Sequence, residues 1–423
     1  MRARPRSGRA ASRRRAKSHE EVPRSGRAAS RRRAKSHEAV PRSGRAASRR
    51  RAESDSHEAV PRRGRAKAPR VHAVILAGGA GERFWPASRQ RRPKPFLRVA
   101  EGRTLLSATL ARARRIARRG DVWVVCGPEH APAIRRATRL PARRVLVEPL
   151  RRNTAMAIAY AAARVAREDP DAVLAVLPAD HRIPDERAFA AAIARAARAA
   201  AAAGAIVTLG VRPTRPDGGY GYIRIGAAAG RAFPGLHRVA RFVEKPDLAR
   251  ARRFLRSGNY LWNAGIFVFC ARTLLGEVEV CAPELHRALA PIQASPRLPA
   301  RPLLARCYRA APSLPIDVAV MEKSRRVWTL PVAFRWSDVG TWSSLASELG
   351  VGPGQSRLVG GELLYDECGG NLVWGRRRVA LLGVEGLAVI DAGDVLMITK
   401  LERSPDVRRI VAALKARRRT DVL

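Results

Sequence analysis

The chain has 423 residues, which is enough for one large domain and a smaller one, each with a buried core. Its formal net charge of +46 favours contact with anions but does not indicate a particular fold. Five dispersed cysteines without a CxxC pair argue against a zinc framework or a disulfide scaffold, and no apolar run reaches the ~18 residues of a membrane span. The basic N-terminus also lacks the apolar segment of a signal peptide, so we expect a cytoplasmic protein without a membrane span.

Residues 1–70 form a basic tail built from repeats, with 24 lysines and arginines against 6 acidic residues. The segment RSGRAASRRRAKSHE begins at Arg6 and again at Arg24, and an interrupted third copy begins at Arg42. The repeats contain no aromatic residue, so they cannot bury a core, and we expect them to be disordered. The alternative is a tail that binds polyanions without sequence specificity and in a salt-sensitive manner.

From Val71 onward, predicted strands alternate with predicted helices. The strands are expected at 71–77, 121–126, 144–148, 172–177 and 205–210, and the helices at 104–119, 154–167 and 186–203. This alternation predicts an α/β fold with a Rossmann-like, mostly parallel sheet and helices on both faces. We expect this domain to span 71–350, followed by a small β-rich C-terminal domain at 351–423 that ends in a helix at 405–417.

A glycine-rich segment, LAGGAGERFWPASRQRRPKPF, ends the first predicted strand and continues beyond it. The dinucleotide fingerprint would place a glycine at the position of Phe84, and the Gly-Lys-Ser/Thr of a Walker loop is absent. Two cations follow instead, Arg83 and a Lys94 that lies between prolines. A guanidinium can clamp phosphate oxygens and an ammonium adds a point charge, so the segment predicts a phosphate-binding loop. The residues expected against the nucleotide in this loop are Leu76, Gly78, Gly79 and Gly81.

Acidic residues stand at the ends of two other predicted strands. Glu148 ends the strand at 144–148, and Asp180 follows the strand at 172–177. Ligands of parallel sheets bind beyond the carboxyl ends of the strands, so both carboxylates are expected on the rim that holds the glycine-rich segment. Asp180 is well placed as an oxygen ligand for Mg²⁺, although a lone aspartate after a strand is more often a helix cap.

Eight motifs in order carry a resemblance to a known family. They are LAGGAGERFWPASR with PKPF, VEPLRRNTAMAIAYAA, VLPADH, GYGYI, RFVEKPD, YLWNAGIFVF, IDVAVMEKS and WSDVGTW. From about Val71 to Lys415 the chain resembles the sugar-phosphate nucleotidyltransferases, and among them the monofunctional bacterial mannose-1-phosphate guanylyltransferases. The resemblance implies that 71–350 is a nucleotidyltransferase catalytic domain.

The resemblance also implies a role for each motif. Arg83 and Lys94 are expected to act as catalytic cations beside Asp180 and Asp338, two carboxylates that hold Mg²⁺ between the nucleotide and the sugar phosphate. Glu148 is expected to choose the base, because a carboxylate can accept two N–H groups from the edge of guanine. The remaining implied contacts are Asn153 and Thr154 to the nucleotide, and Gly221, Tyr222, Glu244, Lys245 and Asn263 to the sugar phosphate. His181 is expected to have a structural role.

The implied reaction converts GTP and α-D-mannose 1-phosphate into GDP-mannose and pyrophosphate. An oxygen of the sugar phosphate attacks the α-phosphorus in line, and it needs no base because it is already anionic. Another nucleoside triphosphate and sugar 1-phosphate pair is one alternative. A non-catalytic regulatory paralogue is another, although the retained catalytic charges argue against it.

Two departures from the family pattern touch no catalytic charge. Met156 stands where proline is common, and Val318 stands where tyrosine is common. Isomerase activity is not expected, because the chain ends soon after its last predicted helix. A homodimer is possible.

Overall fold

The computed structural model describes residues 68–423 apart from residues 80, 101 and 296–298. The tail predicted for residues 1–70 therefore lies outside the described residues up to residue 67. Within the described part of the chain, no helix is long and apolar enough to cross a membrane.

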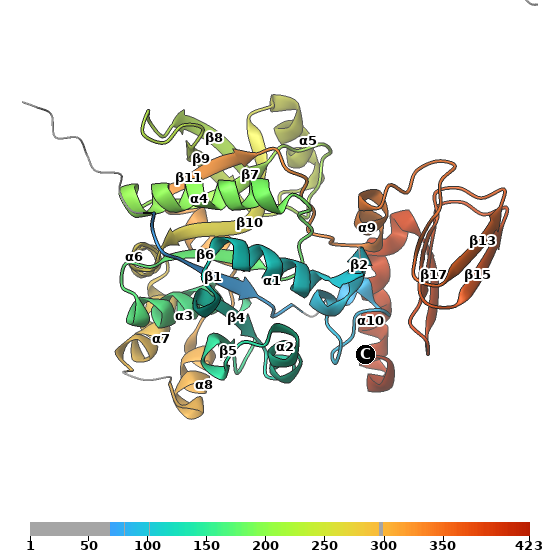
Figure 1. The fold of residues 1–423 in the computed structure, drawn as a ribbon, viewed down its shortest axis with the longest axis horizontal. Helices are drawn as coiled ribbons and strands as arrows, with labels where there is room; N and C mark the ends of the chain where they lie inside the picture. Colours follow the sequence, from blue (N-terminus) through green and yellow to red (C-terminus); the bar gives the residue numbers. More distant parts are fainter. Residues whose placement is uncertain (1–67, 80, 101, 296–298) are drawn as a thin grey trace, which may run out of the picture. The chain divides into compact units, whose positions relative to one another are not determined.

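Among the described residues, nine strands form the main sheet in the order β5-β4-β1-β6-β10-β7-β11-β9-β8 (Figure 1). The strands are β1 (Val71–Leu76), β4 (Val122–Cys126), β5 (Val145–Val147), β6 (Val173–Pro178), β7 (Ile206–Val211), β8 (Tyr222–Ala228), β9 (His237–Val243), β10 (Tyr260–Cys270) and β11 (Val327–Val332). Strands β5, β4, β1 and β6 pair in parallel, which confirms the Rossmann-like core of the prediction. These strands are almost wholly buried because helices cover both faces of the sheet.

The other half of the sheet is mixed, a feature that the alternation of strands and helices does not predict. β10 runs antiparallel to both of its neighbours, β6 and β7, while β7 pairs in parallel with β11. The register between β10 and β7 shifts between Asn263 and Phe267, where Gly265 has a φ of +65°. A bulge re-aims the side chains beside it, and Asn263 is one of them.

Successive residues of a strand point to opposite faces of the sheet. Because both sets of side chains are apolar in the central strands, helices cover both faces. Val74 belongs to the core with α3 and α6, whereas Ala73 and Ile75 belong to the core with α1 and α4. The bounds are α1 (Leu105–Ile116), α2 (Ala131–Thr138), α3 (Asn153–Glu168), α4 (Glu186–Ala203), α5 (Leu248–Ser257), α6 (Ala271–Cys281), α7 (Pro283–Ala294) and α8 (Arg301–Ala310). Three of these, α1, α3 and α4, confirm predicted helices.

Helix α4 has the bounds that the sequence predicts. The Asp185 carboxylate accepts a hydrogen bond from the Ala188 backbone N–H at 2.8 Å and so caps the first turn. Gly204 ends the helix in the left-handed conformation, with a φ of +58°. Both signals are local in the sequence, which is why the ends of this helix could be predicted.

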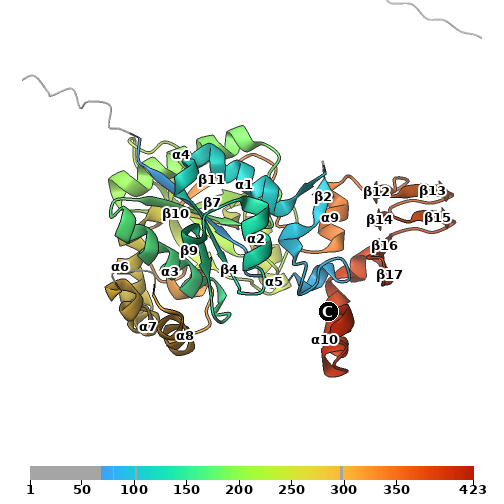
Figure 2. The ribbon, with the colours of Figure 1, turned by 60° about the horizontal axis from the view of Figure 1, so that its bottom comes forward.

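After residue 350 the chain forms short strands that stack mostly in parallel (Figure 2). β12 (Arg357–Val359), β14 (Leu372–Trp374) and β16 (Leu387–Asp391) pair in parallel, and β17 (Leu396–Lys400) adds to β16 in antiparallel fashion. β13 (Glu362–Asp366) and β15 (Arg378–Leu382) form a second parallel pair. The predicted β-rich region is confirmed, and its parallel stacking is a finding of the structure. Two further short strands, β2 (Arg98–Ala100) and β3 (Arg103–Thr104), precede α1.

The C-terminal region shares a hydrophobic core with the glycine-rich segment. Phe84 packs on Trp342, the first residue of α9 (Trp342–Glu348), with ring centroids 4.7 Å apart. Val407 and Val411 of α10 (Val407–Ala416) join the same core. The segment that carries Arg83 is therefore held by side chains from the far end of the chain.

Candidate active site

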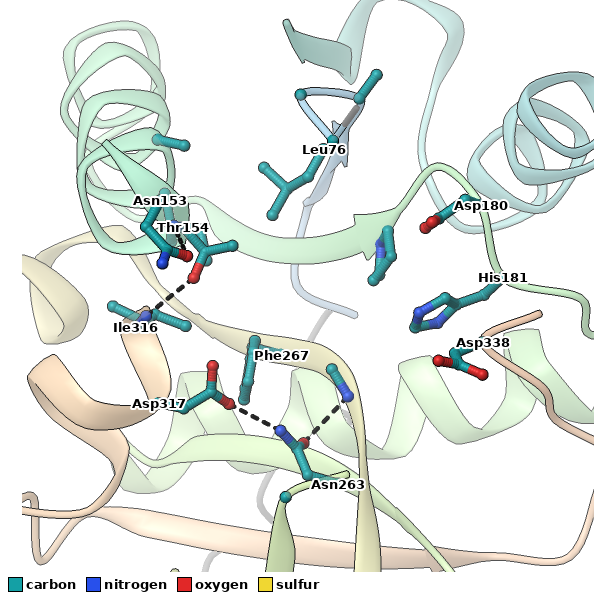
Figure 3. A pocket seen from close by; sticks show the side chains of 18 of the residues that line it. Leu76, Asn153, Thr154, Asp180, His181, Asn263, Phe267, Ile316, Asp317 and Asp338 are labelled. Atoms are coloured by element: carbon teal, nitrogen blue, oxygen red, sulfur yellow. Dashed lines mark hydrogen bonds between the residues drawn. The ribbon is translucent and has the colours of Figure 1, made fainter. Parts of the chain in front are cut away.

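A cavity of about 520 Å³ lies at the carboxyl ends of β1 and β6, within the usual size range of small-molecule sites. Figure 3 shows Asp180, His181 and Asp338 together on one side of this cavity, with Asn153 and Thr154 on another. The predicted residues that line it are Leu76, Gly78, Gly79, Gly81, Lys94, Glu148, Asn153, Thr154, Asp180, Gly221, Glu244, Lys245, Asn263 and Asp338. The cavity thus brings together residues from all eight motifs.

Lys94 occupies a fixed position at the floor of the cavity. Its side chain is only 8 % exposed, and its ammonium donates to Asp180 Oδ2 and to the backbone oxygen of Asp338, both at 2.7 Å. Gly81 has a φ of +66°, and a Cβ added there would lie 2.5 Å from Lys94 Cβ. Glycine at position 81 is therefore required both by the turn and by the lysine packed against it.

Asp180 follows β6 directly and stays ionised beside Lys94. Burial alone would raise the pKa of this carboxyl, but the charge of Lys94 and its hydrogen bond bring it below its ordinary value. Burial lowers the pKa of His181 to about 4, so this imidazole is neutral at physiological pH. Its Nδ1 accepts a hydrogen bond from Trp336 Nε1 at 3.2 Å, which fits the structural role predicted for it.

Asp338 lines the cavity and directly follows Ser337, which pairs with Arg182 in an isolated antiparallel bridge. Its Oδ1 accepts a hydrogen bond from the Tyr220 hydroxyl at 2.8 Å. Burial, reinforced by the Asp338 carboxylate, raises the pKa of Tyr220 far above its usual range, so the hydroxyl remains a donor. The next residue, Val339, has a φ of +45°, which is unusual for a β-branched residue and shows backbone strain beside the carboxylate.

The donor set of the cavity fits a magnesium ion that is shared with a substrate. Asp180 and Asp338 each keep one carboxylate oxygen that accepts no side-chain hydrogen bond from the described residues. No cluster of three or more His, Cys, Asp or Glu side chains in the described ranges could hold a metal on its own. Magnesium commonly takes one or two carboxylates and completes its shell with substrate phosphates and water, which matches this arrangement.

Asn263 and Asp317 form a hydrogen-bonded pair on the opposite wall. Asn263 Oδ1 accepts from Thr208 Oγ1 at 2.8 Å and from the Gly265 backbone at 3.1 Å, while its Nδ2 donates to Asp317 Oδ1 at 2.8 Å. The amide oxygen is thus already used by the protein, and one N–H remains for a ligand. Asp317, which the sequence interpretation did not select, supplies the acceptor on this wall.

The Glu244–Lys245 pair stands next to Asp317. The two side chains are in direct contact as an ion pair, and the backbone N–H of Glu244 donates to Glu322 at 2.9 Å. Burial, with the nearby Glu244, raises the pKa of Asp317 to about 7. This end of the cavity therefore offers two carboxylates and an ammonium, which suits a ligand with hydroxyls and a phosphate. A Cβ added to Gly221 would lie 2.8 Å from Glu244 Oε2 and 3.3 Å from Asn263 Cβ, so the backbone passes close to both side chains.

Glu148 stands at the other end of the cavity, behind the glycine-rich segment. It is 9 % exposed and accepts a hydrogen bond from the Tyr308 hydroxyl at 3.2 Å. Burial raises its pKa to about 7. A Cβ added to Gly78 would lie 3.4 Å from Glu148 Oε2, so the segment passes close to this carboxylate.

Asn153 and Thr154 begin helix α3 beside Glu148. Asn153 has a φ of +60°, and its Oδ1 accepts a hydrogen bond from the Thr154 backbone at 2.9 Å. Thr154 Oγ1 accepts a hydrogen bond from the Ile316 backbone at 2.9 Å, which ties the start of α3 to the start of the short helical segment Asp317–Met321 (Figure 3). Asn153 and Thr154 therefore line the cavity, and the hydrogen bond of Thr154 also connects α3 to the segment that carries Asp317.

Arg83 does not line the main cavity but an adjoining recess of about 360 Å³. The recess shares Gly81, Lys94, Asp180, His181 and Asp338 with the main cavity. Among the described residues, no hydrogen bond or ion pair engages the Arg83 guanidinium. The predicted cation is therefore next to Lys94, but it faces a neighbouring space.

The predicted contact of Tyr222 with the sugar phosphate is wrong, because Tyr222 does not line the cavity. Its ring is fully buried against Phe254, and its hydroxyl accepts a hydrogen bond from the Asp217 backbone at 3.1 Å. The tyrosine that lines the cavity is Tyr220, two residues earlier. The motif GYGYI offers both residues, and the pairing of Tyr222 with Trp262 on β10 turns Tyr222 into the core.

Comparisons with known proteins agree with this arrangement. Residues 72–349 match the family model described as nucleotidyl transferase, and residues 367–414 match the one described as MannoseP isomerase/GMP-like beta-helix domain. The chain is 38% identical over 357 residues to the xanthan biosynthesis protein XanB of Xanthomonas campestris pv. campestris, a match that covers 83% of this chain and 74% of that protein. It is 36% identical over 357 residues to the mannose-1-phosphate guanylyltransferase RfbM of Salmonella typhimurium, covering 82% and 73%.

A solved structure resembles most of the described part of the chain. This is a crystal structure from Thermus thermophilus, described as a mannose-1-phosphate geranyltransferase, with a TM-score of 0.75 and 37% sequence identity. The match covers 82% of this chain and 99% of that one. The alginate biosynthesis protein AlgA of Pseudomonas aeruginosa is a further relative, 37% identical over 366 residues that cover 82% and 73% of the two chains.

Proposed function

The chain belongs to the nucleotidyl transferase family, and we propose that it transfers a guanylyl group from GTP to α-D-mannose 1-phosphate. The products are GDP-mannose and pyrophosphate. One observation supports the proposal: a single cavity has the carboxylate of Glu148 at one end and the Glu244–Lys245 pair at the other. Lys94 and the two aspartates lie between these ends, where the phosphates of the two substrates would meet.

The reaction needs positioning and charge neutralisation more than proton transfer. An oxygen of the sugar phosphate attacks the α-phosphorus of GTP, the new P–O bond forms, and the bond to the β-phosphate breaks as pyrophosphate leaves. The attacking oxygen is anionic, so no side chain has to remove a proton. Lys94, fixed by two hydrogen bonds, offers a charge that costs no rearrangement when the transition state forms.

Nucleotidyltransferases of this family generally use divalent metal ions. We propose that Asp180 and Asp338 hold Mg²⁺, which would draw the nucleotide and sugar phosphates together and offset their charge. Tyr220 would then orient Asp338 through its hydroxyl, and Lys94 would keep Asp180 ionised.

We propose that Glu148 selects guanine over the other bases. An ionised carboxylate can accept hydrogen bonds from N1–H and the 2-amino group of guanine, whereas adenine has no donor at position 1. Asp317 and Glu244 are assigned to hydroxyls of mannose, and Lys245 to its phosphate. The names of the relatives support this substrate pair, and biosynthesis of polysaccharides in the cytoplasm is the role that we propose.

A matrix of substrates tests the proposal. Pyrophosphate release is measured for the full-length protein with GTP, ATP, UTP and dTTP, each combined with mannose 1-phosphate and glucose 1-phosphate in Mg²⁺. We expect GTP with mannose 1-phosphate to give the highest kcat/KM by at least about 100-fold. A higher value for another pair would point to the alternative nucleotidyltransferase, and no turnover with any pair would favour a regulatory paralogue.

A further inference from the structure

The recess beside the main cavity has a wall that comes from the C-terminal region. Besides the residues shared with the main cavity, it is lined by Glu82, Arg83, Phe84, Gly340 and Arg408. Arg408 is the second residue of α10 and is exposed. Two guanidiniums and the ammonium of Lys94 thus face one space of about 360 Å³.

The position of Arg408 is set by the packing of α10. The residue before it, Val407, is 3 % exposed and belongs to the core that contains Phe84 and Trp85. Further along the helix, Lys415 forms an ion pair with Glu82. Helix α10 is thus attached through Val407 and Lys415 to the segment around Arg83. These two contacts keep Arg408 in the wall of the recess that Arg83 also lines.

The two guanidiniums of the recess have no side-chain partner in the part of the chain that the structure describes. Among the described residues, no hydrogen bond or ion pair engages Arg83 or Arg408. Asp406, whose carboxylate senses the charge of Arg408, is paired with Arg403 at 2.6 Å. Glu82, the carboxylate on this wall, is paired with Lys415. Asp180 and Asp338 also line the recess, at the edge that it shares with the main cavity. Away from that edge, the side-chain charges without a partner among the described residues are those of Arg83 and Arg408, which suit an anion with several charges.

We propose that Arg408 binds the leaving pyrophosphate together with Arg83. This inference rests on the proposed function. The recess and the main cavity share Lys94, Asp180 and Asp338, where the α-phosphate would lie, so the β- and γ-phosphates would reach the recess side of these residues. Arg408 then becomes a substrate-contacting residue supplied by the β-rich C-terminal region, and that region completes the active site.

Direct binding of inorganic pyrophosphate in Mg²⁺, measured by calorimetry on the full-length protein, tests this inference. The variants are Arg408→Ala, Arg408→Lys and Arg83→Ala, with Arg409→Ala as the matched control. Arg409 is the next residue of α10, is equally exposed and does not line the recess. We expect Arg408→Ala to weaken pyrophosphate binding by about 10-fold or more, Arg408→Lys to restore part of it, and Arg409→Ala to leave it within about twofold.

Kinetics of the reverse reaction provide the second measurement. For Arg408→Ala the KM for pyrophosphate should rise by about 10-fold while the KM for GDP-mannose stays unchanged. Equal effects of Arg408→Ala and Arg409→Ala, or no effect of Arg408→Ala beside a clear effect of Arg83→Ala, would overturn the assignment. So would a wild-type protein that binds no pyrophosphate. Failure of the proposed function is recognised separately, as the absence of guanylyl transfer by a wild-type protein that still binds pyrophosphate.

Discussion

Lys94 and Asp180 meet at the centre of the candidate site, with 2.7 Å between Nζ and Oδ2. The two residues come from different motifs, and the same ammonium also donates to the backbone oxygen of Asp338. One cation therefore ties together the two segments that carry the carboxylates. It leaves Asp180 partly accessible, since this side chain is 32% exposed.

Removing the ammonium should affect catalysis much more than folding. We expect Lys94→Ala to lower turnover by about 10²–10³-fold, because a fixed charge that stabilises the transition state is lost. The free energy of unfolding should fall by only about 1–2 kcal/mol, since water reaches the exposed part of Asp180. Substrate turnover and urea unfolding measure the two effects, and Arg91→Ala, an exposed neighbour, serves as the control. Near wild-type turnover of Lys94→Ala would refute the assignment.

A methyl group at position 81 should disturb both the fold and the lysine. Alanine there would have to adopt a φ of +66°, and its Cβ would lie 2.5 Å from Lys94 Cβ and 2.9 Å from Ser88 Oγ. We expect Gly81→Ala to reduce the free energy of unfolding by about 1–3 kcal/mol and to lower turnover. Gly276→Ala, in the exposed middle of α6 with open space around it, should instead stabilise by about 0.5–1 kcal/mol. Equal stability changes in the two variants, measured by thermal unfolding, would contradict this account.

Local signals explain what the sequence could predict. The bounds of α4 follow from a capping aspartate and a terminal glycine, and the buried strands β1, β4 and β6 follow from their apolar runs. The antiparallel place of β10 between β6 and β7 has no such local signal, because it depends on which strands pair.

In the candidate site, too, some residues could be predicted from local sequence signals, whereas others depend on how distant segments pack. Motif residues such as Lys94, Asp180 and Glu148 could be placed from the sequence because each follows a strand or a glycine turn. The choice between Tyr220 and Tyr222 depends on the pairing of β8 with β10, which the sequence does not state. Arg408 lies outside the eight motifs, and only the packing of α10 brings it to the recess.

The Asp338 carboxylate should matter more than the hydroxyl that orients it. Asp338→Asn removes a charge that we propose binds Mg²⁺, and we expect turnover to fall by at least about 100-fold at all Mg²⁺ concentrations. Tyr220→Phe removes one hydrogen bond of 2.8 Å to Asp338, so turnover should fall by less than about 10-fold. A Mg²⁺ titration of both variants separates the two effects. Full activity of Asp338→Asn would rule out the two-carboxylate site.

Glu148 should make the protein less stable as the pH rises. Burial raises its pKa from an ordinary 4.5 to about 7, so the folded state keeps a proton that the unfolded state has lost between these values. Stability from this group therefore falls as the pH rises from about 4.5 to 7, by up to about 3 kcal/mol, and stays low above pH 7. Glu148→Gln should remove this cost and raise the free energy of unfolding at pH 8. Urea unfolding at pH 5 and pH 8 measures it, with the exposed Glu279→Gln as control. An equal gain at both pH values would contradict this prediction.

The same carboxyl should make GTP binding depend on pH with the opposite sign. Guanine N–H groups require the ionised form, so the KM for GTP should rise as the pH falls below about 7, by about 10-fold at pH 6. Glu148→Gln should lose both this dependence and the preference for GTP over ATP. Asp317, whose pKa is also raised to about 7, lies at the other end of the cavity, so Asp317→Asn should change only the pH dependence of the KM for the sugar phosphate. If Asp317→Asn abolished the pH dependence of the KM for GTP and Glu148→Gln did not, the two ends of the cavity would have to be exchanged.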